Sequence, residues 1–309
     1  MTRDTIKIGT RGSQLAMFQA ELTKKELLKK FQGIAVEIAI IKTTGDKIQN
    51  VALSKIGERG LFTEEIENSL LKGEIDMAVH SLKDLLTTLP GELKVGAVLK
   101  RGEFRDALVS KDGRKLHELT AGDIIATSSL RRTAGLLCIN KDLSIVDIRG
   151  NVNTRLRKME DGYCGAMIMA AVGLQRLGLA HYITEIIEPE LIMPAPGQGA
   201  IAIEARRDDS RIDAYLQGIN HIETQNIVEI ERAFLRRIEG GCQVPVGCYT
   251  ITHKDSITIT GFVASVDGKE FLVDSESGMI TQGMEIGERL ADKLIKQGAG
   301  RIIEKIRRQ

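Results

Sequence analysis

Apolar residues in the larger, N-terminal part of the chain follow two alternating spacings. Short runs that alternate apolar and polar residues or are apolar throughout predict strands at 6–9, 36–41, 75–79, 107–110, 124–126, 145–148, 166–169 and 201–204. Between several of these runs, three- and four-residue spacing predicts helices, the first of which has Leu15, Phe18 and Leu22 on its apolar side. Strands that alternate with helices are typical of α/β folds, so we expect two such domains here.

Helix-start and helix-end signals place further helices in this part. Thr63 is expected to cap one of them, with acidic residues in its first turn and Gly73 at its end. Two others are expected to begin near Leu130 and to cover about 154–159.

The C-terminal part has a different order of elements. A first helix has its apolar residues on one face and its charged residues on the other: Ile227, Ile230, Phe234 and Ile238 against Glu229, Glu231, Arg232 and Arg236. Strands at 249–252, 257–263 and 270–273 follow, with a turn at Asp267 and Gly268, and then a helix through Ile286, Leu290 and Leu294. This order predicts a small α+β domain.

The segment 193–199 combines prolines and glycines, which break both regular structures, and is the best linker candidate. Its glycines superficially match a dinucleotide-binding fingerprint, but 201–204 alternates like a strand where that motif needs a helix. We therefore expect three domains: 1–99 with 200–217, 100–199, and 218–309.

Composition narrows the class of protein. The chain has 309 residues, of which 42% are hydrophobic and 28% charged, and a net charge of only +1. We therefore expect a globular protein that binds no nucleic acid and no membrane, and a monomer. No export signal opens the sequence, which favours the cytoplasm, and the spacing of the cysteines and histidines favours neither disulfides nor a metal site.

Polar residues gather directly after four of the predicted strands. They include Arg11 and Ser13; Ser81, Lys83 and Asp84; Thr127, Ser129, Arg131 and Arg132; and Arg149, Asn151 and Arg155, with Arg176 further on. The carboxyl ends of strands in open α/β sheets converge on a crevice, and guanidinium groups suit carboxylates and phosphates. The pattern predicts a site for a polyanion, although any one of these arginines could equally be a solvated surface residue.

Cys242 stands between Gly240-Gly241 and Pro245, just after the predicted helix that Gly240 ends. The negative end of the helix dipole opposes a thiolate, so a tethering role suits this cysteine better than that of a free nucleophile. A buried structural thiol is the ordinary alternative. Asp84 likewise has two readings, since it could stabilise positive charge or cap the turn after Ser81.

Seven motifs, taken together and in this order, closely resemble those of the porphobilinogen deaminases, also called hydroxymethylbilane synthases. They are Gly9-Thr10-Arg11-Gly12-Ser13-Gln14-Leu15-Ala16, Gly60-Leu61-Phe62, His80-Ser81-Leu82-Lys83-Asp84, Thr127-Ser128-Ser129-Leu130-Arg131-Arg132, Arg149-Gly150-Asn151-Val152-Asn153-Thr154-Arg155, Gly197-Gln198-Gly199-Ala200 and Gly240-Gly241-Cys242-Gln243-Val244-Pro245. The resemblance spans nearly the whole chain.

The resemblance implies two α/β domains with mixed sheets, like those of periplasmic binding proteins, and a small C-terminal α+β domain. It implies an enzyme of tetrapyrrole biosynthesis that condenses four porphobilinogen molecules into hydroxymethylbilane and releases ammonia at each addition. The growing chain is built on a dipyrromethane cofactor, which the resemblance attaches to Cys242 through a thioether.

The resemblance also assigns roles to residues. Asp84 would be catalytic, because it would face pyrrole N–H groups when positive charge passes through them. The cofactor would contact Ser81, Lys83, Asp84, Thr127, Ser129, Arg131, Arg132, Asn151 and Arg155. Porphobilinogen and the growing chain would contact Arg11, Ser13, Arg149, Arg155, Arg176 and Gln198. A flexible loop would contain Lys55, Arg59 and Phe62, and this chain departs from the commoner pattern there at 57–60.

Two other functions stay open at this point. A non-catalytic, two-lobed protein that binds an oxyanion or dicarboxylate would also need clustered arginines, but it has no use for the Cys242 loop. A phosphate-handling transferase would need a glycine-rich phosphate loop, which the sequence lacks.

Overall fold

The computed structural model describes residues 4–47, 63–238 and 244–308. The chain divides into two compact units, of which the first contains Met1–Gly102 and Gly199–Gln225 and the second contains Glu103–Gln198 and Asn226–Gln309. One boundary between the units therefore falls inside the expected linker segment. The expected division into three domains stays a prediction.

The first unit contains a mixed five-stranded sheet in the order β2-β1-β3-β10-β4. Its strands are β1 (Asp4–Thr10), β2 (Ile34–Ile40), β3 (Met77–Ser81), β4 (Leu93–Val98) and β10 (Ile201–Arg206). Strand β1 runs parallel to both β2 and β3, whereas β10 runs antiparallel to both β3 and β4. The carboxyl ends of β1, β2, β3 and β4 therefore meet at one edge of the sheet, together with the start of β10.

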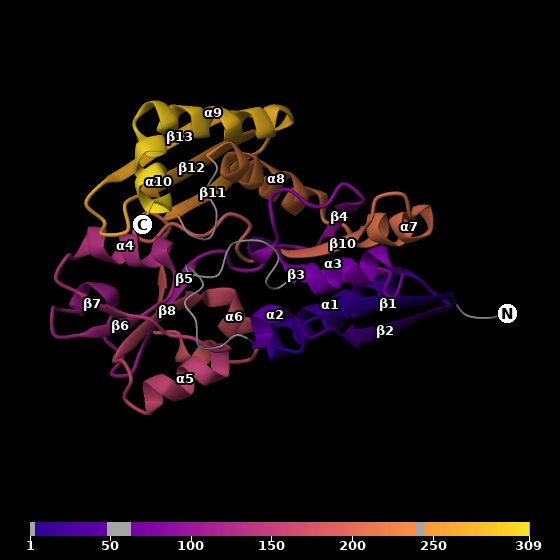
Figure 1. The fold of residues 1–309 in the computed structure, drawn as a ribbon, viewed down its shortest axis with the longest axis horizontal. Coiled ribbons are helices and arrows are strands. Elements are labelled where there is room, and N and C mark those ends of the chain that lie inside the picture. The colour runs from indigo at the N-terminus through magenta and orange to yellow at the C-terminus, as the bar shows by residue number, and fades with distance from the viewer. Residues whose placement is uncertain (1–3, 48–62, 239–243, 309) are drawn as a thin grey trace. The chain divides into compact units, whose positions relative to one another are not determined.

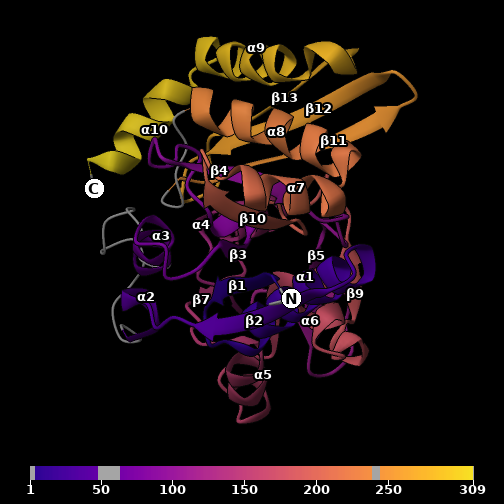
Figure 2. The same ribbon diagram turned by 90° about the vertical axis from the view of Figure 1, so that its right-hand side faces the viewer.

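Helices cover both faces of this sheet. They are α1 (Gln14–Lys30), α3 (Glu64–Leu71) and α7 (Ser210–Ile219), and the unit also contains the short α2 (Thr44–Lys47) and the 3-10 turn η2 (Leu82–Asp84). Alternate strand residues pack against α1 and α7 on one face, where Ala20, Leu27 and Leu216 are buried. The opposite face packs against Ile66 and Leu70 of α3, and Figure 2 shows α3 on the other side of the sheet from α1 and α7.

The second unit contains another mixed five-stranded sheet, in the order β7-β6-β8-β5-β9. The strands are β5 (Asp106–Ser110), β6 (Ile124–Ala126), β7 (Ser144–Val146), β8 (Ala166–Ala170) and β9 (Glu185–Ile187). Helix α4 (Leu130–Ile139) packs on one face, and α5 (Val152–Glu160) and α6 (Ala171–Arg176) pack on the other. The 3-10 turns η3 (Leu116–Glu118) and η4 (Ala180–Tyr182) complete the connections.

The C-terminal part of this unit has an antiparallel sheet in the order β11-β12-β13. The strands are β11 (Val246–His253), β12 (Ser256–Ala264) and β13 (Phe271–Met279); the turn η5 (Ile280–Gln282) and the helices α9 (Gly283–Lys296) and α10 (Ala299–Arg307) follow. Phe234 of α8 (Ile222–Arg237), Ile259 of β12 and Leu290 of α9 share one fully buried core. Figure 1 shows α9 lying along this sheet.

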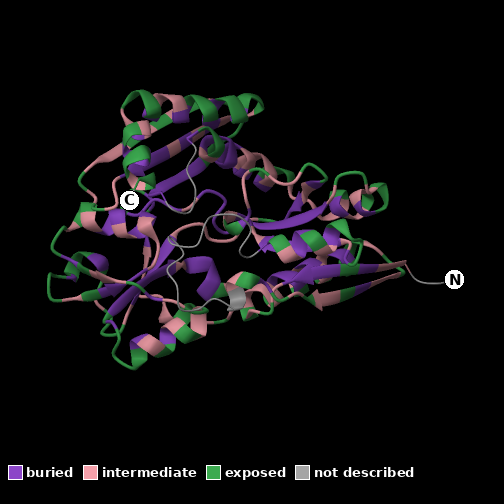
Figure 3. Cartoon of the chain, viewed as in Figure 1, coloured by how far each residue is buried: buried purple, intermediate pink, exposed green. Residues whose placement is uncertain are grey.

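The fold class predicted from the sequence, two α/β sheets of mixed direction and a smaller α+β part, is confirmed. Buried residues are concentrated on the central strands, as Figure 3 shows for β5 and β8. No helix in the described part of the chain is both long and apolar enough to span a bilayer.

Three details of the helix predictions are wrong. Phe18 is exposed, and the fully buried face of α1 carries Ala20 and Leu27. Glu231 of α8, expected on a solvated face, is buried, and its Oε2 accepts a hydrogen bond of 2.7 Å from the Gly197 amide. Arg232, expected on the same solvated face, is also buried.

The third error concerns Thr63, which stands at the predicted cap position of α3 but makes no capping bond with its side chain. Six of the described helices and strands had no prediction: β4, β9, α2, α6, α7 and α10. The expected helix end at Gly240 lies outside the described residues.

Candidate functional site

The polar residues that follow β1 and β3 lie at one edge of the first sheet. Ile8 of β1 pairs in parallel with Met77 of β3, so both strands end on the same side. Arg11 and Ser13 directly follow β1, and the turn η2 with Lys83 and Asp84 directly follows β3. The first unit thus presents two cations, one carboxylate and a hydroxyl from neighbouring strand ends.

Ser13 begins helix α1. Its Oγ accepts a hydrogen bond of 3.2 Å from the amide of Ala16, so it caps the helix that follows β1. The free amides and the positive dipole end of a helix favour an anion at this position. Arg11, two residues before the cap, is half-buried.

Asp84 is presented by a turn that is fixed on both sides. Ser81 Oγ accepts a hydrogen bond of 2.8 Å from Gln19 Nε2, and the Leu82 amide donates to the Ala200 carbonyl at 3.1 Å. Leu82 is 1% exposed, whereas Asp84 is exposed. Ser81, and not Asp84, occupies the cap position of the turn, so a capping role does not account for this carboxylate.

A buried group of titratable residues lies behind this turn and was not recognised from the sequence. His80 Nε2 lies 3.1 Å from Glu204 Oε2, and the two side chains are 5% and 0% exposed. Burial raises the pKa of the nearby Glu67, and the charge of Glu204 acts in the same direction. One signal in the sequence pointed to this group, the position of His80 directly before Ser81, but Glu204 and Glu67 come from other elements.

The second unit repeats this arrangement with more arginines. Strands β6, β7 and β8 are parallel, so the residues that follow them lie at the same edge. Thr127, Ser129, Arg131 and Arg132 follow β6; Arg149, Asn151 and Arg155 follow β7; and Arg176 ends the helix that follows β8. The loops that carry these residues therefore begin at one edge of the second sheet.

Hydroxyl groups shape the loop between β6 and α4. The Ser129 amide donates to Thr127 Oγ1 at 3.3 Å, and Ser129 stands at the cap position of α4 without a capping bond from its own side chain. Ser128 Oγ donates to the Ile148 carbonyl at 2.8 Å and accepts from the Ile148 amide at 3.0 Å. The loops that follow β6 and β7 are thus joined.

Arg131 and Arg132 are both buried, and both contact Asp106, the first residue of β5. Gln198 is also fully buried, and its Nε2 donates to Asp106 Oδ1 at 2.8 Å and to the Phe104 carbonyl at 2.7 Å. Asp106 was missed in the sequence because it begins a strand, whereas the other site residues follow strands. Because β5 runs antiparallel to β8, its first residue, Asp106, lies at the edge where β8 ends.

The loop after β7 is held by its own helix. Asn151 Oδ1 accepts a hydrogen bond of 2.9 Å from the Thr154 amide and caps α5. Arg155 Nε donates to the Gly150 carbonyl at 2.8 Å, and Lys158 Nζ donates to the Arg149 carbonyl at 3.1 Å. Arg149 and Arg155 are half-buried, so part of each side chain remains accessible.

Arg176 occupies a different environment at the end of α6. Burial lowers the pKa of its guanidinium group to about 10, which still leaves it charged at neutral pH. A partly desolvated cation binds an anion more strongly than a solvated one, because less water must be removed.

Several expected site residues cannot be placed. Cys242 and the loop residues Lys55, Arg59 and Phe62 lie outside the described residues. Within the described ranges, no group of three or more histidine, cysteine, aspartate or glutamate residues is arranged to hold a metal ion.

Comparison with known families gives two matches that together cover most of the chain. Residues 6–214 match the model described as porphobilinogen deaminase, dipyromethane cofactor binding domain. Residues 226–296 match the model described as porphobilinogen deaminase, C-terminal domain.

Similar proteins of known name agree with these matches. The chain is 47% identical over 306 residues to a porphobilinogen deaminase of Geobacter metallireducens, covering 99% of this chain and 96% of that protein. It is 47% identical over 304 residues to one of Pelotomaculum thermopropionicum, covering 98% and 97%. Among solved structures, a TRAP periplasmic solute binding protein from Desulfovibrio salexigens is 12% identical, with a TM-score of 0.44 over 72% of this chain and 74% of that one.

Proposed function

The chain belongs to the porphobilinogen deaminase family, and we propose that Asp84, Cys242 and the arginines of both units carry its activity. It is an enzyme of tetrapyrrole biosynthesis that condenses four porphobilinogen molecules into hydroxymethylbilane, with release of ammonia. It uses a dipyrromethane cofactor. The roles of individual residues are what we propose.

The second unit offers donors that fit an anionic cofactor. When bound, dipyrromethane supplies the primer to which pyrrole units are added, and its acetate and propionate groups are carboxylates. Arg131, Arg132 and Arg155 provide guanidinium groups at one sheet edge, where charge-assisted hydrogen bonds contribute about 1.5 to 3 kcal/mol each. In this proposal the remaining contacts to the cofactor come from Ser81, Lys83, Asp84, Thr127, Ser129 and Asn151.

Incoming porphobilinogen carries carboxylates of its own. In this proposal it is held by Arg11, Ser13, Arg149, Arg155, Arg176 and Gln198. The half-buried guanidinium groups of Arg11 and Arg149 support this role because they combine partial desolvation with access. For Gln198 the amide nitrogen already donates to Asp106 and Phe104, so its contact with substrate would have to use the side-chain oxygen or the backbone.

Asp84 is proposed to stabilise positive charge. Departure of the amino group from porphobilinogen leaves an electron-poor pyrrole, and the charge is shared with its ring nitrogen. A fixed, exposed carboxylate that accepts the pyrrole N–H lowers the energy of that state. The observation that carries the proposal is the turn after β3, which exposes Asp84 while Ser81 and Leu82 are held by Gln19 and Ala200.

The alternative of a non-catalytic anion-binding protein is not favoured. It explains the arginines, but it gives no role to the exposed carboxylate of Asp84 in the turn after β3. It also gives no role to the glycine-flanked Cys242.

We also propose that the enzyme works as a monomer in the cytoplasm. Cys138, Cys164 and Cys248 are free thiols, which suits a reducing compartment. Sedimentation of the purified full chain tests the monomer.

The mass of the denatured, full-length protein tests the covalent tether. Protein purified from cells that make porphobilinogen should exceed its sequence mass by two linked pyrrole units. The Cys242→Ser variant should have the sequence mass, whereas Cys138→Ser, which removes an exposed thiol elsewhere, should retain the added mass. Active protein with no added mass would exclude the tether.

A further inference from the structure

Asp106 is a buried carboxylate to which the sequence assigns no role. It is the first residue of β5 and is 0% exposed. It pairs with Ala170 at the carboxyl end of β8 and with Ile187 of β9, so it lies at the edge where the arginine-rich loops begin.

Four N–H groups converge on the two oxygens of this carboxylate. Arg132 donates from Nε to Oδ2 at 3.1 Å and from Nη2 to Oδ1 at 2.8 Å. Arg131 Nη1 lies 2.8 Å from Oδ2, and Gln198 Nε2 donates to Oδ1 at 2.8 Å. An ionised carboxylate accepts about four hydrogen bonds, so these donors occupy it fully. Asp106 therefore has no capacity left for a ligand.

The two arginines depend on this carboxylate because they are buried side by side. Burial lowers the pKa of Arg131, and the neighbouring charge of Arg132 lowers it further, while Asp106 opposes both effects. For Asp106 itself, burial opposes ionisation, but the two guanidinium groups hold its pKa well below the ordinary value. A buried charge that loses its only counter-ion is strongly destabilised.

The two guanidinium groups are engaged to different extents. Arg132 uses its Nε and Nη2 edge on Asp106 and donates from Nη1 to the Ile168 carbonyl at 3.3 Å. Arg131 uses only Nη1, which contacts Asp106 and also donates to the Met193 carbonyl. Within the described ranges, Nε and Nη2 of Arg131 have no hydrogen-bond acceptor, and this is the edge with which arginine binds a carboxylate bidentately.

We propose that Asp106 is a positioning residue that holds Arg132 in place and fixes Arg131 with its Nε and Nη2 edge available to a carboxylate of the dipyrromethane. The inference rests on the proposed function, because it needs the cofactor to be bound in this unit. Asp106 acts through the arginines and does not touch the cofactor itself. Asp106 also holds Gln198, the last residue of the segment Glu103–Gln198 of the second unit.

Loading of the cofactor tests the role of Asp106. Full-length protein is produced in cells that cannot make porphobilinogen, porphobilinogen is then added, and the gain of two pyrrole units is followed by intact mass. The Asp106→Asn variant should load at least about tenfold more slowly than the unchanged protein, because displaced guanidinium groups bind a carboxylate poorly. Once loaded, its KM for porphobilinogen should change less than its loading rate, since Arg131 and Arg132 hold the cofactor and Asp106 contacts the substrate-binding set through Gln198.

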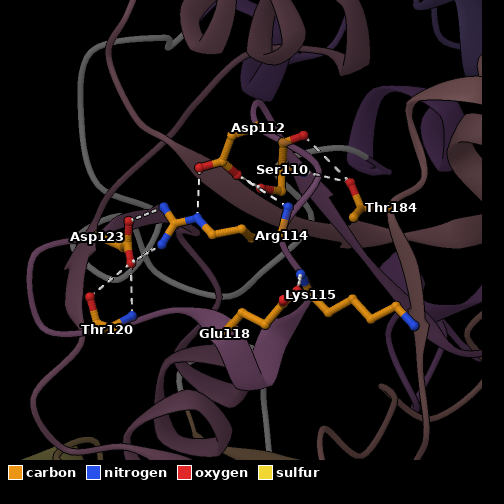
Figure 4. Close-up of polar contacts among 8 residues, drawn as sticks. All are labelled: Ser110, Asp112, Arg114, Lys115, Glu118, Thr120, Asp123 and Thr184. Atoms are coloured by element: carbon orange, nitrogen blue, oxygen red, sulfur yellow. Dashed lines mark hydrogen bonds and ion pairs between the residues drawn. The ribbon is translucent and has the colours of Figure 1, made fainter.

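Asp123→Asn is the matched control. Asp123 accepts two hydrogen bonds from the Arg114 guanidinium, as Figure 4 shows, and this contact lowers the pKa of Asp123 to about 2. It lies in the same unit but not among the site residues, so its variant should load at the normal rate. A slow Asp123→Asn variant would mean that loss of any such ion pair delays loading, and would overturn the inference.

A second pair of variants covers the case in which Asp106→Asn does not fold. Arg132→Met removes the second buried charge and leaves Asp106 paired with Arg131. The double variant Asp106→Asn/Arg132→Met also removes that remaining pair, so it should load at least about tenfold more slowly than Arg132→Met. Equal loading of Asp106→Asn and the unchanged protein, or of the two Arg132→Met proteins, would overturn the inference. Failure of the unchanged protein to gain mass would instead overturn the proposed function.

Discussion

Gln19 donates a hydrogen bond of 2.8 Å to Ser81 and thereby joins helix α1 to the last residue of β3. Gln19 is 2% exposed, so the bond is shielded from water, and Thr23 Oγ1 donates to the Gln19 carbonyl at 2.9 Å one turn later. The buried face of α1 is therefore partly polar, and its polar groups hold the strand end from which the turn with Asp84 begins. The position of the Asp84 carboxylate depends on this turn.

Replacing Asp84 by asparagine should slow the reaction while leaving substrate binding largely intact. The amide keeps the size of the side chain but lacks the charge that stabilises the cationic pyrrole, so kcat should fall by about 10²-fold or more. The KM for porphobilinogen should change much less. Single-turnover kinetics with loaded enzyme measure the effect.

Two variants control this experiment. Asp84→Glu retains the charge and should keep more activity than Asp84→Asn. Asp208→Asn removes an exposed carboxylate that follows β10, at the opposite edge of the same sheet, and should have normal kcat. Near-normal turnover by Asp84→Asn would remove this residue from the mechanism.

Much of the fold could be predicted because its strands are short, buried and bounded by clear turn residues. The expected strand 124–126 coincides with β6, and that at 107–110 differs from β5 by one residue. Helix faces were harder to predict. In α1 and α8 the buried positions include Gln19 and Glu231, whose hydrogen-bond partners are distant in sequence and leave no periodic signal.

The same limit applies to the site. Residues that follow parallel strands could be predicted to share an edge, because topology alone brings them together. Asp106 could not, since its place depends on the antiparallel direction of β5, and the pairing of His80 with Glu204 depends on β10, a distant segment. Contacts formed across a sheet require the order of its strands, which a single sequence does not supply.

The stability of the protein should carry a pH signature from Glu67. Burial raises its pKa in the folded state, Glu204 and Glu64 add to the shift, and His80 opposes it. Above the unfolded pKa of about 4.3, the folded state therefore holds more proton than the unfolded state, and stability falls as pH rises through the folded pKa. In Glu67→Gln, which is always neutral, this decline should be absent.

Urea unfolding of the two proteins at about pH 4 and about pH 8 measures this difference. At each pH, the urea midpoint of the unchanged protein is subtracted from that of Glu67→Gln. This difference should be larger at about pH 8 than at about pH 4. Glu74→Gln, an exposed glutamate in the turn after α3, should show no such change. A relative midpoint for Glu67→Gln that is the same at both pH values would contradict the assigned shift.

Gly150 should tolerate no side chain, because its φ of +114° is combined with a close neighbour. A Cβ atom there would lie 2.6 Å from Thr154 Cγ2, on the helix capped by Asn151. We expect Gly150→Ala to lower the free energy of unfolding by about 1 to 3 kcal/mol and to displace the carbonyl that holds Arg155, so that the KM for porphobilinogen rises. Gly162→Ala separates the two causes, since Gly162 has a φ of +89° with open space around it, and should lose stability without a change in KM. Urea unfolding and steady-state kinetics of both variants decide the matter, and an unchanged KM in Gly150→Ala would show that this loop does not position a substrate-binding arginine.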